Sequence, residues 1–149
     1  MAYFPDLSPC TYFRDVAGVY NMPSVIAVGW LDGKHAFTKG DPGIEVFERL
    51  KSFRHYNAWL EAIAFGGHMC ELCRYPHTGS AENLFIPAGG ITYVAPEGIL
   101  HYIGAHGYGP PEVFCEAVLK CPNRNTSEYV ARLKANGWSA ELIEEIETL

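Results

Sequence analysis

Long apolar runs, basic side chains and the common catalytic motifs are all scarce in this 149-residue sequence. The longest apolar runs, such as residues 25–30 and 62–65, fall far short of the ~20 residues that a membrane-spanning helix needs. The first residues carry no basic region and no apolar core, so we expect no signal peptide and a cytoplasmic protein. The GxSxG, P-loop, GxGxxG and HExxH patterns do not occur, which removes the motif support for those enzyme and nucleotide-binding classes.

Basic residues are also few, with 11 Lys and Arg against 17 Asp and Glu and a net charge of −6. Nucleic-acid binding depends on clustered cations that displace counterions from phosphates. The densest basic group, Arg49, Lys51 and Arg54, fits one exposed face of a helix. We therefore expect no nucleic-acid partner, and a zinc-framework nuclease is disfavoured for the same reason.

Hydrophobic patterning predicts a single α+β domain over residues 1–149, in which residues 123–149 form a helical C-terminal extension. An extended aromatic arm is expected first, at residues 1–23. Strands are expected at 24–31, 84–87 and 91–94, the last two forming a β-hairpin. Residues 59–65 fit a strand or a helix, and a strand is favoured. Helices are expected at 43–55, 96–106, 111–120 and 126–136, with a final helix after residue 139. The predicted architecture is a small antiparallel sheet, a zinc-knuckle/β-hairpin/helix unit and C-terminal helices.

Individual residues predict where these helices begin and end. Pro96 is expected at the first helical position of its helix, Gly107 at its end, and Asn125 as the cap of the helix at 126–136. Ser139 is expected to cap the final helix. The apolar stripe of that helix must be buried either on its own domain or on a second copy, which permits a homodimer. The stripe consists of Leu142, Ile143, Ile146 and Leu149.

Cysteine and histidine are abundant for this length, with five and six residues respectively. In a reducing compartment this combination favours metal binding over disulfides. Two thiolates in Cys70-x-x-Cys73 can hold one tetrahedral ion from a tight turn, and the pair His101-x4-His106 can complete the ligand set from a helix end. The sequence therefore predicts a Zn²⁺ site formed by Cys70, Cys73, His101 and His106.

Two features leave alternatives open at this site. A five-residue spacing does not put His101 and His106 on one face of an ideal helix, so the helix would have to end or widen near Gly104. The Cys-x-x-Cys pair could instead be a redox dithiol, although such pairs normally follow a βαβ unit, and no such unit precedes Cys70.

A third alternative changes the function. His68 could replace either histidine as a ligand, and three protein ligands would leave an open position for catalysis. The protein would then be a zinc-dependent enzyme, hydrolytic or deamination-like, with His68 or Glu71 moving protons. A solvent-facing loop carboxylate is the simpler interpretation of Glu71. We expect Cys115 to be a buried small hydrophobe, and His35, His55 and His77 to lie on the surface.

Five motifs stand out along the sequence: residues 3–12 (YFPDLSPCTY), residues 28–32 (VGWLD), His68-x-Cys70-x-x-Cys73, Tyr93-x-Ala95-Pro96, and the run from His101-Tyr102 through His106 and Tyr108 to Pro110-Pro111 and Phe114. In combination they resemble a family of small uncharacterised bacterial proteins. The resemblance covers about residues 1–118. Because the family is classed as a domain of unknown function, it implies no activity. It does imply that the cysteine pair and the two histidines occur together, as a zinc site would require.

These observations predict a small cytoplasmic zinc-binding protein with a mainly structural metal site. Its role would be binding or regulation, with a protein partner or a second copy of the chain. The zinc-dependent enzyme remains the alternative, and the sequence does not define a small-molecule substrate.

Overall fold

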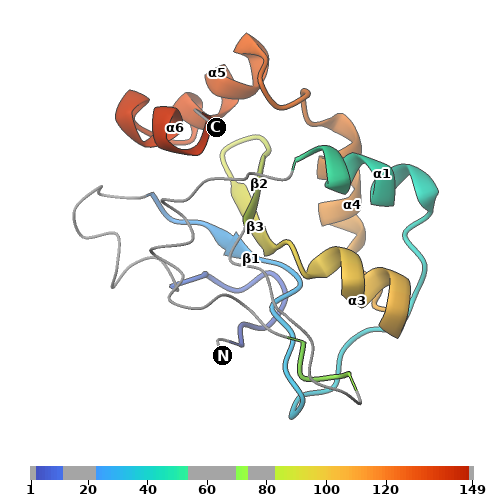
Figure 1. Cartoon of the computed structure of the whole chain (residues 1–149). Helices are drawn as coiled ribbons and strands as arrows, with labels where there is room; N and C mark the ends of the chain where they lie inside the picture. The colour runs from blue at the N-terminus through green and yellow to red at the C-terminus, as the bar shows by residue number, and fades with distance from the viewer. Residues whose placement is uncertain (1–2, 12–22, 54–69, 74–82, 148–149) are drawn as a thin grey trace.

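The computed structural model of the chain describes residues 3–11, 23–53, 70–73 and 83–147. Three strands and five helices lie within these residues (Figure 1). In chain order they are β1 (Ile26–Ala27), α1 (Ile44–Ser52), β2 (Asn83–Pro87), β3 (Thr92–Pro96), α3 (Ile99–His106), α4 (Glu112–Lys120), α5 (Ser127–Ala135) and α6 (Ala140–Glu147). The expected α+β class is confirmed.

The sheet has the strand order β1-β3-β2. The expected hairpin is confirmed, because β2 pairs antiparallel with β3 and places Phe85 opposite Val94. β1 pairs parallel with β3, however, so the sheet is mixed and not purely antiparallel as predicted. Parallel neighbouring strands need a long connection, and here both α1 and β2 lie between β1 and β3 in the sequence.

The expected strand at 24–31 is reduced to Ile26–Ala27. Gly29 interrupts it with a φ of +80°, where a Cβ atom would lie 2.9 Å from the side chain of Ile99. The N-terminal arm instead pairs along the outer side of β1, where the Leu7 amide donates to the Ala27 carbonyl and the Ala27 amide donates to the Ser8 carbonyl, both at 2.8 Å. The described part of the expected arm is therefore packed against the sheet. It is not extended throughout, because residues 6–8 form a turn in which Leu7 has a φ of +67° and the Ser8 amide donates to the Pro5 carbonyl at 3.1 Å.

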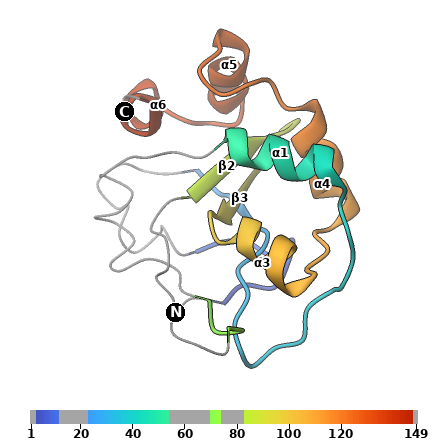
Figure 2. The ribbon, with the colours of Figure 1, turned by 45° about the vertical axis from the view of Figure 1, so that its right-hand side comes forward.

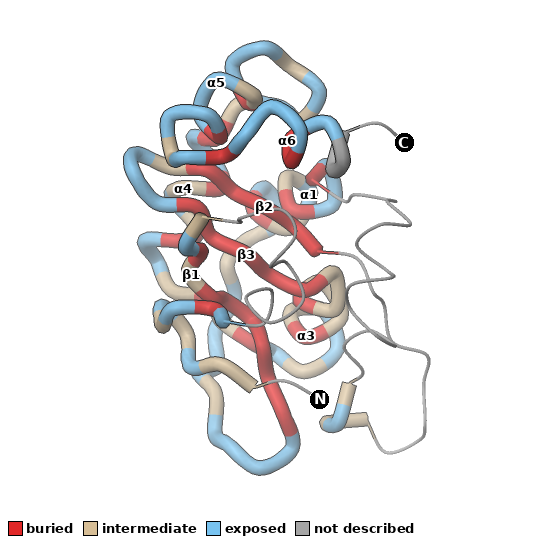
Figure 3. Tube along the Cα trace, turned by 90° about the vertical axis from the view of Figure 1, so that its left-hand side faces the viewer, coloured by how far each residue is buried: buried red, intermediate tan, exposed pale blue. Residues whose placement is uncertain are grey.

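Helices α1, α3 and α4 lie on one side of the sheet (Figures 1 and 2). Helix α1 contacts both α3 and α4, and α4 also contacts β2. Buried residues are concentrated along the strands and on the helix faces that meet them (Figure 3). The largest fully buried side chains include Trp30, Tyr102, Tyr108, Tyr129, Phe53 and Phe85.

The C-terminal helices pack against the hairpin. The Tyr129 hydroxyl of α5 donates to the Phe85 carbonyl at 2.6 Å. The Trp138 ring meets the Phe85 ring edge-on, with centroids 4.9 Å apart. Leu142 and Ile143 of the predicted stripe are buried within the chain itself. The side chains of the other two stripe residues, Ile146 and Leu149, lie outside the described part.

Four expected helix boundaries have a definite outcome, and Gly107 ends α3 as predicted. Pro96 is the last residue of β3 and not the first of α3, which begins at Ile99. A proline is tolerated there because β1 pairs only with Tyr93 and Val94, so no ladder bond on that side needs an amide at Pro96.

The cap of α5 is Thr126, whose side-chain oxygen accepts from the Tyr129 amide, and not Asn125 as predicted. Asn125 takes a left-handed conformation, with a φ of +68°, which belongs to the turn before the helix. The prediction for α6 is confirmed, because the Ser139 hydroxyl accepts from the Leu142 amide. The strand expected at residues 59–65 lies outside the described residues.

The helices of the described residues are each eight or nine residues long. None of them combines the length and the apolar character that a crossing requires.

Candidate metal centre

The two cysteines of the predicted site lie in the short segment 70–73. Both Cys70 and Cys73 are partly buried, while Glu71 between them is exposed. Leu72 packs against the core. The Glu71 carboxylate accepts a hydrogen bond from the Gly33 amide at 3.1 Å. The segment is therefore held in place by one polar and one apolar contact besides the cysteines.

The two histidines lie on α3, and its last turn brings them together. Residues five apart on an ideal α-helix point about 140° away from each other. Here the Gly107 amide donates to the Tyr102 carbonyl, five residues back in place of the usual four, which makes the last turn wider. The Nε2 atoms of His101 and His106 lie 3.2 Å apart as a result. This confirms the expectation that the helix must widen or end near Gly104.

A second pairing fixes the chain just beyond His106. The Gly40 amide donates to the Gly107 carbonyl at 3.0 Å, and the Gly109 amide donates to the Thr38 carbonyl at 2.9 Å. Gly109 is required for this approach, because a Cβ atom there would lie 2.8 Å from the Cα of Gly40. The end of α3 is thus anchored to residues 38–40.

The ligand atoms of Cys70, Cys73, His101 and His106 all lie within 4.8 Å of one another. The Cys73 sulfur is 3.1 Å from the His101 Nε2 atom and 3.5 Å from the His106 Nε2 atom. The Cys70 sulfur is 3.4 Å from the His106 Nε2 atom.

These separations fit the edges of a tetrahedron around one ion. Zinc–sulfur and zinc–nitrogen bonds of normal length give edges of about 3.5 Å between sulfur and nitrogen and about 3.3 Å between two nitrogens. The structure therefore brings all four predicted residues together in an arrangement that can hold a metal ion.

The cluster favours the neutral thiol of Cys73 in the absence of a cation. Partial burial and the neighbouring Cys70 thiol raise the pKa of Cys73. Burial, with the charges of Cys70 and Glu71 added, likewise raises the pKa of Tyr102 beneath the cluster. A bound divalent cation reverses this preference, because a coordinating thiol is deprotonated.

The other residues considered for chemistry are not all placed. His55, His68 and His77 lie outside the described residues. Glu71 is exposed, in agreement with a solvent-facing loop carboxylate. Cys115 is partly and not fully buried, and all five cysteines of the chain are free.

His35 is exposed as expected, but it has a defined partner that sequence analysis missed. Its Nδ1 atom lies 2.9 Å from both carboxylate oxygens of Asp32. Burial acts to raise the pKa of Asp32, but hydrogen bonds from His35 and the Lys34 amide outweigh it and lower the pKa overall. The turn pair Asp32-Gly33 was the one sequence signal at this position.

A second missed residue is Asp6 of the arm. One of its carboxylate oxygens accepts from the Gly29 amide at 3.0 Å, and the other accepts from the Tyr108 hydroxyl at 2.7 Å. Both partners are distant in sequence, so spacing gives no signal for this contact.

Comparison with known proteins assigns the chain to a family. No curated protein and no solved structure matches it. A domain of unknown function (DUF7919) matches residues 2–119, a span that includes the four residues of the candidate metal centre and ends within α4. The chain therefore belongs to the family of that domain of unknown function, DUF7919.

Proposed function

We propose that Cys70, Cys73, His101 and His106 bind one Zn²⁺ ion and that the role of this ion is mainly structural. The observation that supports the proposal is the convergence of the four ligand atoms within 4.8 Å. Two thiolates and two imidazoles in a tetrahedral arrangement are the ligand set typical of structural zinc.

The ion would join two parts of the chain that are far apart in sequence. Segment 70–73 would be linked to α3, and the end of α3 is already paired with residues 38–40. Because the ligands meet only in the folded chain, the free energy of zinc binding adds to the free energy of folding.

A structural metal leaves the function to a surface, so we propose a binding or regulatory role with a protein partner or a second copy of the chain. The location that fits is the cytoplasm, because zinc thiolates need reduced cysteines and all five cysteines are free. The net charge of −6 disfavours a nucleic-acid partner.

The enzyme alternative needs one coordination position left open to solvent. Four converging protein ligands leave none, and the Glu71 carboxylate already accepts the Gly33 amide. The alternative regains support only if His101 or His106 does not bind the ion.

Elemental analysis of freshly purified protein tests the proposal, and we expect about one zinc ion per chain. Replacement of zinc by Co²⁺ should give the absorption of a tetrahedral thiolate complex. Cys73→Ser should lose both the metal and the cobalt absorption, since a hydroxyl is a much poorer ligand.

Cys115→Ser is the matched control, because it removes another partly buried thiol that lies outside the cluster. It should retain one ion per chain. A metal-free wild-type protein whose melting curve is unchanged by Cys73→Ser would contradict the proposal.

A further inference from the structure

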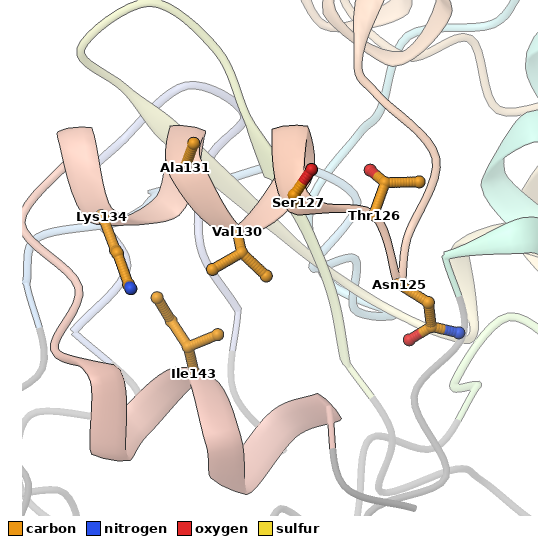
Figure 4. A pocket seen from close by; sticks show the side chains of 7 residues that line it. All are labelled: Asn125, Thr126, Ser127, Val130, Ala131, Lys134 and Ile143. Carbon is orange, nitrogen blue, oxygen red and sulfur yellow. The ribbon is translucent and has the colours of Figure 1, made fainter.

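Three cavities in the described residues differ in chemistry. The groove between α5 and α6 has a volume of about 570 Å³, and Val130 and Ile143 face each other across it, with Lys134 at one end (Figure 4). A second groove, of about 470 Å³ between α1 and α3, is lined by Ile44, Phe47 and several glycines. Nothing in either groove specifies an occupant.

The third cavity lies between the N-terminal arm and residues 31 and 36–38, and we call it the arm pocket. Its volume is about 390 Å³. This falls within the range of roughly 300–1,000 Å³ that small-molecule sites occupy. The lining residues that matter here are Tyr3, Phe4, Asp6, Leu31 and Phe37.

Asp6, which is partly buried, is the one acidic residue among those that line the arm pocket. Its two hydrogen-bond donors, the Gly29 amide and the Tyr108 hydroxyl, are both neutral. Among the described residues, no lysine, arginine or histidine forms an ion pair with Asp6. A carboxylate can accept about four hydrogen bonds, so its charge and half of its acceptor capacity are still available to a ligand.

Aromatic residues make up much of the remaining wall. Aromatic faces carry negative charge density and attract cations. The Lys39 ammonium group already occupies one face of the Phe37 ring, 4.4 Å from its centre, so a ligand in the pocket would meet the rest of that ring.

The aromatic walls are also held in place. Phe4 packs edge-on against buried Trp30, with ring centroids 5.7 Å apart. Tyr3 stacks on His35 at 3.8 Å, and His35 is fixed by Asp32. The pocket is therefore formed before any ligand arrives, which lowers the entropic cost of binding.

We propose that the arm pocket binds a small organic cation of the methylated-ammonium type. Asp6 would balance the charge, while Phe4, Phe37 and Leu31 would contact the methyl groups. A methylated ammonium fits these walls better than a primary amine, because it has fewer N–H groups that need hydrogen-bond acceptors.

Titration of the whole protein with choline, followed by calorimetry and by the NMR signal of the Gly29 amide, tests this proposal. Choline should bind saturably and shift the Gly29 signal. The uncharged isostere 3,3-dimethylbutan-1-ol should bind at least tenfold more weakly. A blocked trimethyllysine, N-acetyl and N-methylamide, shows whether the cation belongs to a free molecule or to a modified peptide, according to which binds more tightly.

Two variants identify the pocket. Asp6→Asn should weaken choline binding at least tenfold. Phe37→Leu should do the same. Phe37 forms no hydrogen bond with Asp6 but packs edge-on against Tyr108, so the NMR signal of the Gly29 amide in the free variant must first match the wild type. The variant then gives a second test if Asp6→Asn does not fold. Phe47→Leu, in the groove between α1 and α3, is the matched control and should bind choline as the wild type does.

The proposal is overturned if the neutral alcohol binds as tightly as choline. It is equally overturned if choline does not bind, or if folded Phe37→Leu keeps the wild-type affinity.

Discussion

The protonation of single residues controls the proposed metal centre. Zinc binds the thiolate form of cysteine, and the pKa of the Cys73 thiol is raised in the metal-free protein by burial and by Cys70. A raised pKa in the fold means that the neutral thiol is stabilised. In the metal-free protein this contribution to stability is present at low pH and is lost as the pH rises above the thiol pKa of the unfolded chain.

Zinc should therefore bind more tightly as the pH rises. Below the pKa of the thiol, the affinity for zinc rises about tenfold per pH unit for each thiol proton that zinc displaces. We expect the dissociation constant to fall at least about tenfold between about pH 7 and about pH 8. Competition with a chromophoric chelator at each pH measures it, and an affinity independent of pH would argue against thiolate ligands.

The histidine assignment has its own test in His106→Ala. Removal of groups that only orient zinc ligands already costs about 10–100-fold in affinity, so loss of a direct ligand should cost more. His35→Ala is the control, because it removes an exposed imidazole whose ion pair with Asp32 lies outside the cluster. Chelator competition and thermal melts report both.

One result would revise the ligand set. If His106→Ala retains the metal and His68→Ala loses it, His68 is the ligand and His106 becomes available for chemistry. The enzyme alternative would then be favoured.

At the scale of secondary-structure elements, sequence patterns identified the helices and the hairpin better than their ends. Gly107 correctly marks the end of α3, because glycine readily adopts the left-handed conformation found there, with a φ of +66°. The hydrogen bond from Gly107 to Tyr102 that widens the last turn has no sequence signature. The pairing of residues 38–40 with the chain at this end of the helix has no sequence signature either, because the two segments are far apart in sequence.

Tertiary packing also explains the shortened β1. An apolar, β-branched run at 24–31 predicts a longer strand, but Ile99 occupies the space beside Gly29. That Cys70, Cys73, His101 and His106 come together was predictable from their types and spacing. Asp6 and the aromatic walls of the arm pocket were not, because their partners come from separate parts of the chain.

Two glycines of the α3 region should respond to alanine in opposite directions. Gly104 lies within the helix and has open space where a Cβ would be, so Gly104→Ala should stabilise the fold by about 0.5–1 kcal/mol. Gly107→Ala should destabilise it by about 1 kcal/mol, because alanine disfavours a positive φ. Urea unfolding of the metal-loaded protein measures both.

Zinc affinity separates the two variants further. Only Gly107→Ala should weaken zinc binding, since Gly107 closes the turn that positions His106. Equal effects on stability in both variants would mean that the positive φ of Gly107 does not matter for the last turn of α3.

At the scale of the whole molecule, the family match ends at residue 119, while α5 and α6 follow it. The two helices are nevertheless tied to the hairpin of the matched region. The Asn136 side-chain amide donates to the carbonyls of Ala88 and Ile91, both at 3.0 Å, and approaches the Thr92 hydroxyl at 2.9 Å. The chain after residue 119 thus completes the core in place of forming a separate appendage.

A chain truncated after Asn136 tests whether the C-terminal helix serves this core or a second copy. The truncation removes three side chains that are buried within the chain, Trp138, Leu142 and Ile143, each worth about 2 kcal/mol of burial. We therefore expect a large fall in melting temperature with no change in oligomeric state, measured by light scattering below that temperature. If the truncated chain instead keeps its stability and changes from dimer to monomer, α6 is the contact between two copies.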